Sequence, residues 1–229
     1  MSTEKIDSLD YYLAPLEGIT GYIYRKRLYE YFGGEIARYF TPFFAPHSKR
    51  KMKSKEVREI LPENNPGFFL VPQILTDSTK DCLNFIRDMK SFGFDEVNLN
   101  AGCPSGTVTS KFRGSGMLTD TERLDHFLEE IFEQSYIKIS VKTRIGFSDT
   151  EEWDEILKVY KKYPISELII HPRTRNEMYG GYITNTFLSE YNYNAEIKVP
   201  SSASISPIMI LKNVVIATSS PIKAILSFG

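Results

Sequence analysis

The chain has 229 residues, of which 41% are hydrophobic and 25% are charged, and its formal net charge is −1. These values are typical of a globular protein that can bury a substantial core. They exclude a chain that attracts nucleic acid through its overall charge, so any such binding would need a local basic patch.

The two cysteines, Cys82 and Cys103, form neither a disulfide framework nor the spacing of a metal site. They suit a reducing, cytoplasmic setting. The first residues contain no apolar signal core, and no apolar run is long enough to span a membrane. We therefore expect a cytoplasmic protein with no metal and no membrane attachment.

Strand and helix patterns alternate along the chain. In order, we expect a strand at 11–16, a helix at 21–32, a strand at 35–44, an exposed basic segment at 47–55, a strand at 68–74 and a helix at 77–92. A strand at 96–99, a helix at 122–134, a strand at 138–142, a helix at 150–163 capped by Thr150 and a strand at 167–171 follow. About six strands precede residue 175, which favours an α/β fold with a TIM-type (β/α)8 barrel over an open sheet.

The stretch from Val97 to Pro104 places Cys103 just past the carboxyl end of a predicted strand. In α/β folds, ligands and catalytic groups collect at that end. A buried structural cysteine in a turn is an equally good interpretation of this stretch alone.

Four polar residues occupy the same place in the strand pattern, at or near strand ends: Gln73, Asn100, Lys142 and His171. In a barrel these ends share one rim, where the side chains would surround a ligand with donors and acceptors. Each also has a structural interpretation, as a loop partner, a solvated strand end or a cap. Their joint placement around Cys103 favours a site.

Several motifs resemble those of the tRNA-dihydrouridine synthases, flavin enzymes that reduce selected uridines in tRNA. The Asn-x-x-Cys-Pro motif, followed by Lys-x-x-Gly-x-Gly, is the most specific of them. The matching stretches run in the family's order at 14–20, 71–74, 97–104, 111–118, 141–146 and 170–175.

The resemblance implies a catalytic site with FMN as cofactor and NADPH as reductant. A hydride would pass from the flavin to C6 of the uracil, and the Cys103 thiol, mostly protonated at neutral pH, would give a proton to C5. The cofactor-binding residues that the resemblance implies are Pro15, Leu16, Glu17, Gln73, Asn100, Lys142 and His171.

The tRNA substrate would meet cationic side chains on the rim, with the segment 47–58 extending the track. An ordinary solvated surface is the alternative for these residues. Cys82, inside a predicted helix, is expected to be a packing residue. The substrate-binding residues that we expect are Lys111, Arg113, Arg144, Arg173 and Arg175.

The C-terminal part departs from the family pattern. We expect a flavin-binding barrel domain at 1–199 and a divergent remainder at 200–229, because Ser202-Ala203-Ser204-Ile205 stands where the family has Asn-Gly-Asp-Ile. A strand at 222–226 would be the last of a barrel that is incomplete at its C-terminal end, and the family's C-terminal helical domain is missing from the sequence. A truncated or frameshifted product is the favoured interpretation, and a diverged short form is the other.

Two further functions compete with uridine reduction. A dihydroorotate dehydrogenase-like flavin barrel also uses an Asn-rich rim, but the Cys103-Pro104 context argues against it. An inactive or RNA-binding remnant without flavin is the non-enzymatic alternative.

Overall fold

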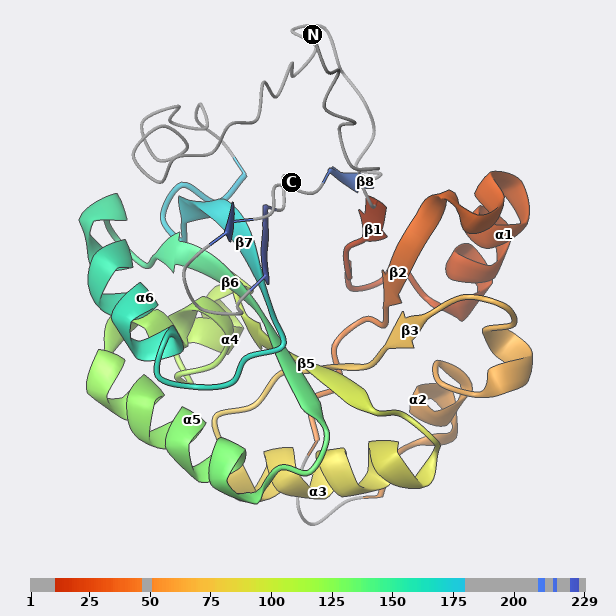
Figure 1. Cartoon of the computed structure of the whole chain (residues 1–229), viewed down its shortest axis with the longest axis horizontal. Coiled ribbons are helices and arrows are strands. Elements are labelled where there is room, and N and C mark those ends of the chain that lie inside the picture. The colour runs from red at the N-terminus through yellow and green to blue at the C-terminus, as the bar shows by residue number, and fades with distance from the viewer. Residues whose placement is uncertain (1–10, 47–50, 180–209, 213–215, 218–222, 227–229) are drawn as a thin grey trace, which may run out of the picture.

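A computed structural model describes residues 11–46, 51–179, 210–212, 216–217 and 223–226. Strands alternate with helices along the chain, and the helices cover the outside of the strands (Figure 1). The α/β class with parallel strands, consistent with part of a TIM barrel, is thereby confirmed.

The described strands form two sheets and not one closed ring. The first has the order β3-β2-β1-β8, and the second has the order β4-β5-β6-β7-β10-β9. Every pairing is parallel except those of β8 with β1 and of β9 with β10. The strands are β1 (Tyr11–Leu13), β2 (Ile36–Phe40), β3 (Leu70–Val71), β4 (Gln73–Ile74), β5 (Glu96–Ala101), β6 (Lys138–Gly146), β7 (Glu167–Thr174), β8 (Ile210–Lys212), β9 (Ile216–Ala217) and β10 (Lys223–Leu226).

Pro72 divides the strand that the sequence predicts at 68–74. Residues before it, in β3, pair with β2, whereas residues after it, in β4, pair with β5. A proline has no N–H for a sheet ladder, yet the carbonyl of Pro72 still accepts the N–H of Asn98 at 2.9 Å. The single predicted strand is therefore wrong, and Pro72 is the corner between the two sheets.

The helices are α1 (Tyr22–Phe32), α2 (Ser54–Arg58), α3 (Thr79–Ser91), α4 (Gly106–Thr109), α5 (Thr121–Gln134) and α6 (Trp153–Tyr160). Single 3₁₀ turns occupy Gly33–Glu35, Pro62–Asn64, Gly114–Thr119 and Thr150–Glu152. Side-chain caps fix two long helices, because Ser78 Oγ accepts the N–H of Asp81 before α3 and Asp120 does the same for Arg123 before α5.

The predicted bounds of a helix and two strands need correction. The basic segment predicted at 47–55 is mostly exposed where the structure describes it, its residues from Ser54 form α2, and residues 47–50 lie outside the described part. The helix predicted at 150–163 begins as a 3₁₀ turn, and Asp149 caps it in place of Thr150. β6 and β7 extend beyond 142 and 171, because strand pairing continues past the apolar alternation.

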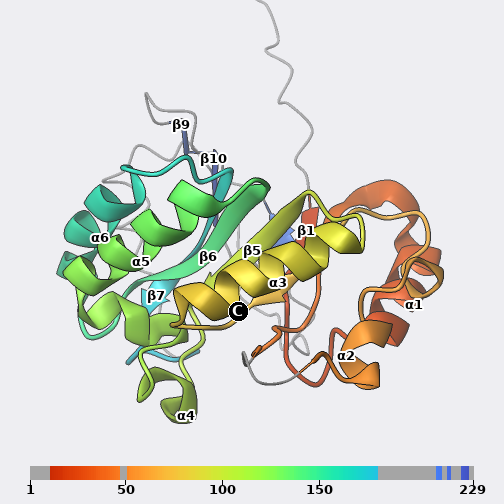
Figure 2. The ribbon, with the colours of Figure 1, turned by 90° about the horizontal axis from the view of Figure 1, so that it is seen from below.

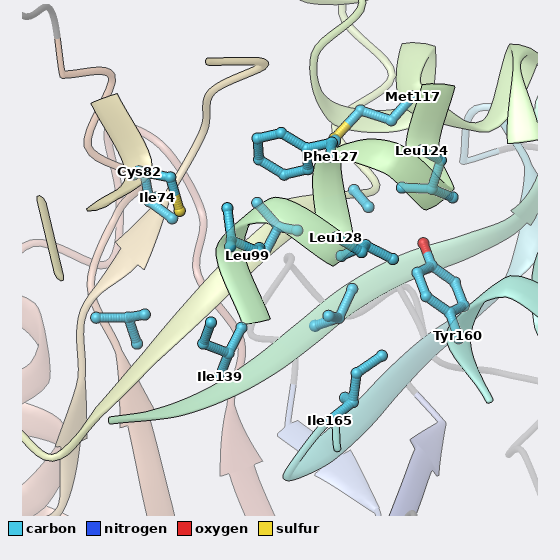
Figure 3. Packing of buried hydrophobic residues seen from close by; sticks show 14 of the residues in the cluster. Ile74, Cys82, Leu99, Met117, Leu124, Phe127, Leu128, Ile139, Tyr160 and Ile165 are labelled. Atoms are coloured by element: carbon cyan, nitrogen blue, oxygen red, sulfur yellow. The ribbon is translucent and has the colours of Figure 1, made fainter. Parts of the chain in front are cut away.

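The main core lies between the second sheet and the helices α3, α5 and α6, which cover one face of that sheet (Figure 2). Figure 3 shows Cys82 of α3 beside Ile74 of β4, and Leu128 of α5 among the residues that pack with Leu99 of β5. Cys82 is a packing residue, as predicted, and its burial raises the pKa of its thiol to about 12.

An ionic cluster on the inner face joins the two sheets near the amino ends of the strands. Arg38 of β2 donates to both carboxylate oxygens of Glu96 of β5 at 2.9 Å and lies 3.6 Å from Glu167 of β7. The hydroxyl of Tyr12 of β1 donates to Glu167 at 2.8 Å. Side chains thus connect β1 and β2 to β5 and β7, strands that do not pair with one another.

The C-terminal expectations are tested only in part. The strand predicted at 222–226 is present as β10, which pairs in parallel with β7. The departure at 202–205 lies outside the described residues, and the interpretation of a truncated or frameshifted chain stays a prediction. Within the described part, no helix has the length and apolar character needed to cross a membrane.

Candidate active site

Parallel register brings the predicted rim residues together on neighbouring strands. Gln73 of β4 lies beside Asn98 of β5, Asn100 of β5 lies beside Lys142 of β6, and His171 of β7 lies beside Arg144 of β6. Side chains of paired residues point to the same face of a parallel sheet, and alternate residues share that face. Gln73, Asn100, Lys142 and His171 therefore gather where the sequence predicts, although their roles stay predictions.

The turn that carries Cys103 is held first by Asn100. Its Oδ1 accepts the backbone N–H groups of Gly102 at 3.1 Å and Cys103 at 2.9 Å. Its Nδ2 donates to Gln73 Oε1 at 2.9 Å, and Gln73 Nε2 donates to Asn98 Oδ1 at 2.7 Å. Asn100 therefore links the cysteine turn to the polar side chains inside the sheet.

A second set of contacts holds the carbonyl side of the same turn. Ser115 donates to the carbonyl of Cys103 through its N–H at 3.0 Å and through its Oγ at 2.9 Å. Arg144 Nε donates to the carbonyl of Gly102 at 2.9 Å. Gly114, at φ +56°, passes so close that a Cβ there would lie 2.7 Å from the carbonyl oxygen of Cys103.

The two cysteines differ in exposure. Cys103 is a free cysteine that is partly exposed, whereas Cys82 is buried. A buried structural cysteine in a turn, the bland interpretation of the sequence, does not describe this residue. Hydrogen bonds hold the backbone on both sides of Cys103 while the residue keeps partial exposure, an arrangement that suits a reactive group.

Several cations lie near Cys103: Lys142, Arg144 and Arg173. Lys142 is half-buried, and within the described residues its ammonium has neither an ion pair nor a hydrogen bond. Burial, together with the positive charge of Arg144, lowers its pKa from 10.5 to about 8. A site with a desolvated ammonium of this kind favours an anionic ligand.

His171 is neutral in this surrounding. Burial lowers its pKa to about 2, and the charges of Lys142, Arg144 and Arg173 act in the same direction. Arg173 Nη1 lies 3.2 Å from His171 Nε2 and must be the donor, since a guanidinium cannot accept. The remaining ring nitrogen, Nδ1, therefore carries the proton.

The turn after β1 lies on the other sheet. Leu16 donates its N–H to Thr20 Oγ1 at 2.8 Å, which closes the turn that follows Pro15 and contains Leu16 and Glu17. Glu17 is exposed and lines a groove of about 870 Å³ between α1 and α2. The structure thus places Pro15, Leu16 and Glu17 after β1, and no described hydrogen bond joins them to Gln73 or Asn100.

Two predicted substrate residues already serve backbone partners. Arg144 is 1% exposed, and its Nη1 donates to the carbonyls of Thr174 and Met178 at 2.8 Å. Arg175 is half-buried, and its Nε donates to the carbonyl of Pro104 at 3.2 Å. Both arginines brace the cysteine turn against the segment after β7.

The other predicted substrate residues differ in how available their charges are. Lys111 is exposed. Arg113 forms an ion pair with Asp77 at 2.6 Å, and Arg173 is 7% exposed beside His171. Lys111 is therefore the one exposed side chain among these five.

Sequence reasoning missed three polar residues of this region: Asn98, Ser115 and Ser140. Asn98 Nδ2 donates to Ser140 Oγ at 3.0 Å, deep inside the sheet. A signal was present, because Asn98 precedes Asn100 by two positions and a strand places such residues on one face. Ser115 lies within the Lys-x-x-Gly-x-Gly stretch, at a position that the motif leaves unspecified.

The sequence of this chain is similar to those of known proteins. Residues 12–203 match the model of a protein family described as "Dihydrouridine synthase (Dus)". The chain is similar to a "Probable tRNA-dihydrouridine synthase" of Staphylococcus epidermidis and to a "Probable tRNA-dihydrouridine synthase 2" of Bacillus subtilis. In both cases the identity is 30% over 167 residues, which is 72% of this chain. The chain spans about half the length (50%) of these curated relatives.

Proposed function

Because this chain belongs to the dihydrouridine synthase family, we propose that it reduces selected uridines in tRNA to 5,6-dihydrouridine, with FMN as cofactor and NADPH as reductant. The observation that carries the proposal is the partly exposed Cys103, whose backbone is held by Asn100 and Ser115 beside Lys142 and Arg144. The family match also argues against the dihydroorotate dehydrogenase-like alternative.

The residues present fit a flavin. The ammonium of Lys142 lacks a carboxylate within the described part of the chain, and it would stabilise negative charge on a reduced ring system. Gln73 retains an N–H that its bonds to Asn98 and Asn100 do not use, which suits a ring carbonyl. Pro15, Leu16, Glu17, Asn100 and His171 complete the proposed cofactor-binding set.

Bound FMN would supply the hydride to the uracil ring, and NADPH would renew it. Cys103 would deliver the proton that the ring carbon needs, since the residue is partly exposed and its backbone is held by Asn100 and Ser115. Neutral His171 would act as a hydrogen-bond donor through Nδ1 and not as an acid, because its pKa lies near 2.

A tRNA substrate needs a flipped uridine and cations for its phosphates. Lys111, Arg113, Arg144, Arg173 and Arg175 are the proposed contacts. The exposed Lys111 would meet a phosphate directly, while Arg144 would act chiefly by bracing the turn. A cytoplasmic location is part of the proposal, because both cysteines are free thiols.

The deciding experiment measures FMN retention and product together. Purified full chain is incubated with FMN, passed through gel filtration and assayed with unmodified tRNA and NADPH for dihydrouridine. We expect retained flavin and product, with product lost in Cys103→Ser and kept in Cys82→Ser. A chain that retains no FMN overturns the cofactor assignment, and equal activity in Cys103→Ser overturns the role of the thiol.

A further inference from the structure

We propose that Asn98 and Ser140 are positioning residues, which set the orientation of the Gln73 and Asn100 amides and so hold the Cys103 turn in place. Both are fully buried, at 0% exposure, one layer below the rim. Their bonds form a continuous chain from Ser140 to the backbone of Cys103, which we call the amide relay: Ser140, Asn98, Gln73 and Asn100.

The polarity of the amide relay follows from the backbone. A backbone N–H can only donate, so the atom of Asn100 that faces Gly102 and Cys103 must be its oxygen. Its nitrogen then faces Gln73 and must meet an oxygen there. By the same rule the nitrogen of Gln73 faces the oxygen of Asn98 at 2.7 Å. Each amide orientation is thereby determined by the one before it.

The relay ends at the hydroxyl of Ser140. Asn98 Nδ2 donates to Ser140 Oγ at 3.0 Å, and the Ser140 hydroxyl donates to the carbonyl of Val97 at 3.4 Å. A hydroxyl both accepts and donates, so it can close the series beside a backbone acceptor. Loss of Asn98 would leave the buried nitrogen of Gln73 without its acceptor, which favours rotation of that amide.

The relay has two consequences at the rim. The first concerns the apoprotein: Asn100 keeps its oxygen toward Cys103 only while Gln73 offers it an acceptor. The second rests on the proposed function: Gln73 presents a donor to the cofactor, and a rotated amide would present its oxygen to a ring carbonyl in place of that donor. Asn98 would therefore influence both thiol position and flavin affinity without touching either.

The test compares three substitutions in the full chain. Asn98→Leu keeps the approximate shape of the side chain and removes both polar atoms. Asn98→Asp preserves the polarity, because burial favours the neutral carboxyl, whose carbonyl oxygen accepts from Gln73 and whose hydroxyl donates to Ser140 Oγ. Asn65→Leu is the matched control, since Asn65 is also buried and hydrogen-bonded, but to Arg25.

The first measurements use the protein without FMN or RNA. Hydrogen exchange of the Gly102 and Cys103 amides and the rate of Cys103 alkylation by iodoacetamide report on the turn, and Cys82 is too buried to contribute. We expect Asn98→Leu to accelerate both about three- to tenfold, because the turn opens more readily. We expect Asn98→Asp and Asn65→Leu to accelerate neither.

Outcomes for the relay and for the proposed function are separable. If folded Asn98→Leu has wild-type rates of hydrogen exchange and alkylation, the relay is overturned, whether or not the chain has enzyme activity. If that variant does not fold, Ser140→Ala decides in the same assay: faster exchange at Cys103 supports the relay, and wild-type exchange overturns it. A wild-type chain that fails to bind FMN overturns the proposed function and leaves the apoprotein result standing. Where FMN binds, its affinity should fall about 10-fold in Asn98→Leu and stay near wild type in Asn98→Asp.

Discussion

Ser115 holds the backbone carbonyl of Cys103 with two donors, its own N–H at 3.0 Å and its hydroxyl at 2.9 Å. This contact is possible because the chain before Ser115 passes over the cysteine turn at Gly114. The stretch after the cysteine motif therefore supports the thiol physically.

Gly114→Ala should destabilise the protein and disturb Cys103. A Cβ at this position would meet the Cys103 carbonyl at 2.7 Å, and φ of +56° is unfavourable for alanine. We expect a loss of about 2–4 kcal/mol in the free energy of unfolding, measured by urea denaturation. Gly93→Ala, with φ +92° but no atom within 4 Å, isolates the backbone cost at about 1 kcal/mol. Gly34→Ala introduces neither a positive φ nor a close contact, so it should change stability little. An equal loss of unfolding free energy in all three variants would contradict this explanation.

Lys142→Met should stabilise the protein at pH 7. The pKa of Lys142 is about 8 in the fold against an ordinary value of 10.5, so the unfolded chain binds more protons between these values. Wild-type stability therefore rises with pH from 8 to 10.5, while below pH 8 the cost of the buried ammonium is fully present. We expect the free energy of unfolding to increase by about 1–3 kcal/mol at pH 7 and by less above pH 8. Thermal unfolding at several pH values measures this difference. A gain that stays constant with pH would rule out the charge as its cause.

His171 should make the fold sensitive to acid. Its pKa is about 2 in the fold and 6.5 ordinarily, so between these values the unfolded chain binds the extra proton and stability falls as the pH drops below 6.5. Between pH 6.5 and pH 4.5, His171→Gln should lose about 1–3 kcal/mol less unfolding free energy than the wild type. Denaturation at each pH measures this loss. His126 is exposed, so His126→Gln is the control and should leave the acid response unchanged. An equal loss of stability in His171→Gln and wild type would contradict the prediction.

Arg38→Met should cost about 3–5 kcal/mol of unfolding free energy, because it removes the cation that both Glu96 and Glu167 contact inside the fold. The two carboxylates are 5% and 3% exposed, so water cannot replace the guanidinium. Urea unfolding measures the loss, and the exposed pair Arg27–Glu30 provides the control, since Arg27→Met should change stability by less than about 0.5 kcal/mol. A similar small effect at Arg38 would show that the ionic cluster does not join the sheets.

Lys111 and Arg113 should differ in their effect on tRNA binding. Lys111 is exposed, whereas the charge of Arg113 is engaged by Asp77 at 2.6 Å. If tRNA is the ligand, Lys111→Ala should lower the slope of log affinity against log salt concentration by about 1, and Arg113→Ala by less. Filter binding across salt concentrations measures both, with the exposed Lys80→Ala on α3 as control. Equal slopes for Lys111→Ala and wild type would remove Lys111 from the proposed interface.

The local patterns of the sequence determined the order of strands and helices and the residues at the strand ends. Alternation and caps depend on neighbours along the chain, so the helices α3 and α5 and the strands β5 and β7 could be predicted from it. Gln73, Asn100, Lys142 and His171 could be grouped because parallel strands share one rim.

Only the tertiary structure decided how those residues are held. The split at Pro72 depends on which strand pairs with each half, and the bracing by Arg144 depends on carbonyls from Gly102 and Met178. The pKa values of Lys142 and His171 arise from burial and from charges distant in sequence. Hydrogen-bond partners and burial depend on which residues are neighbours in space. The sequence pattern identifies candidate site residues but does not determine which of them contact one another.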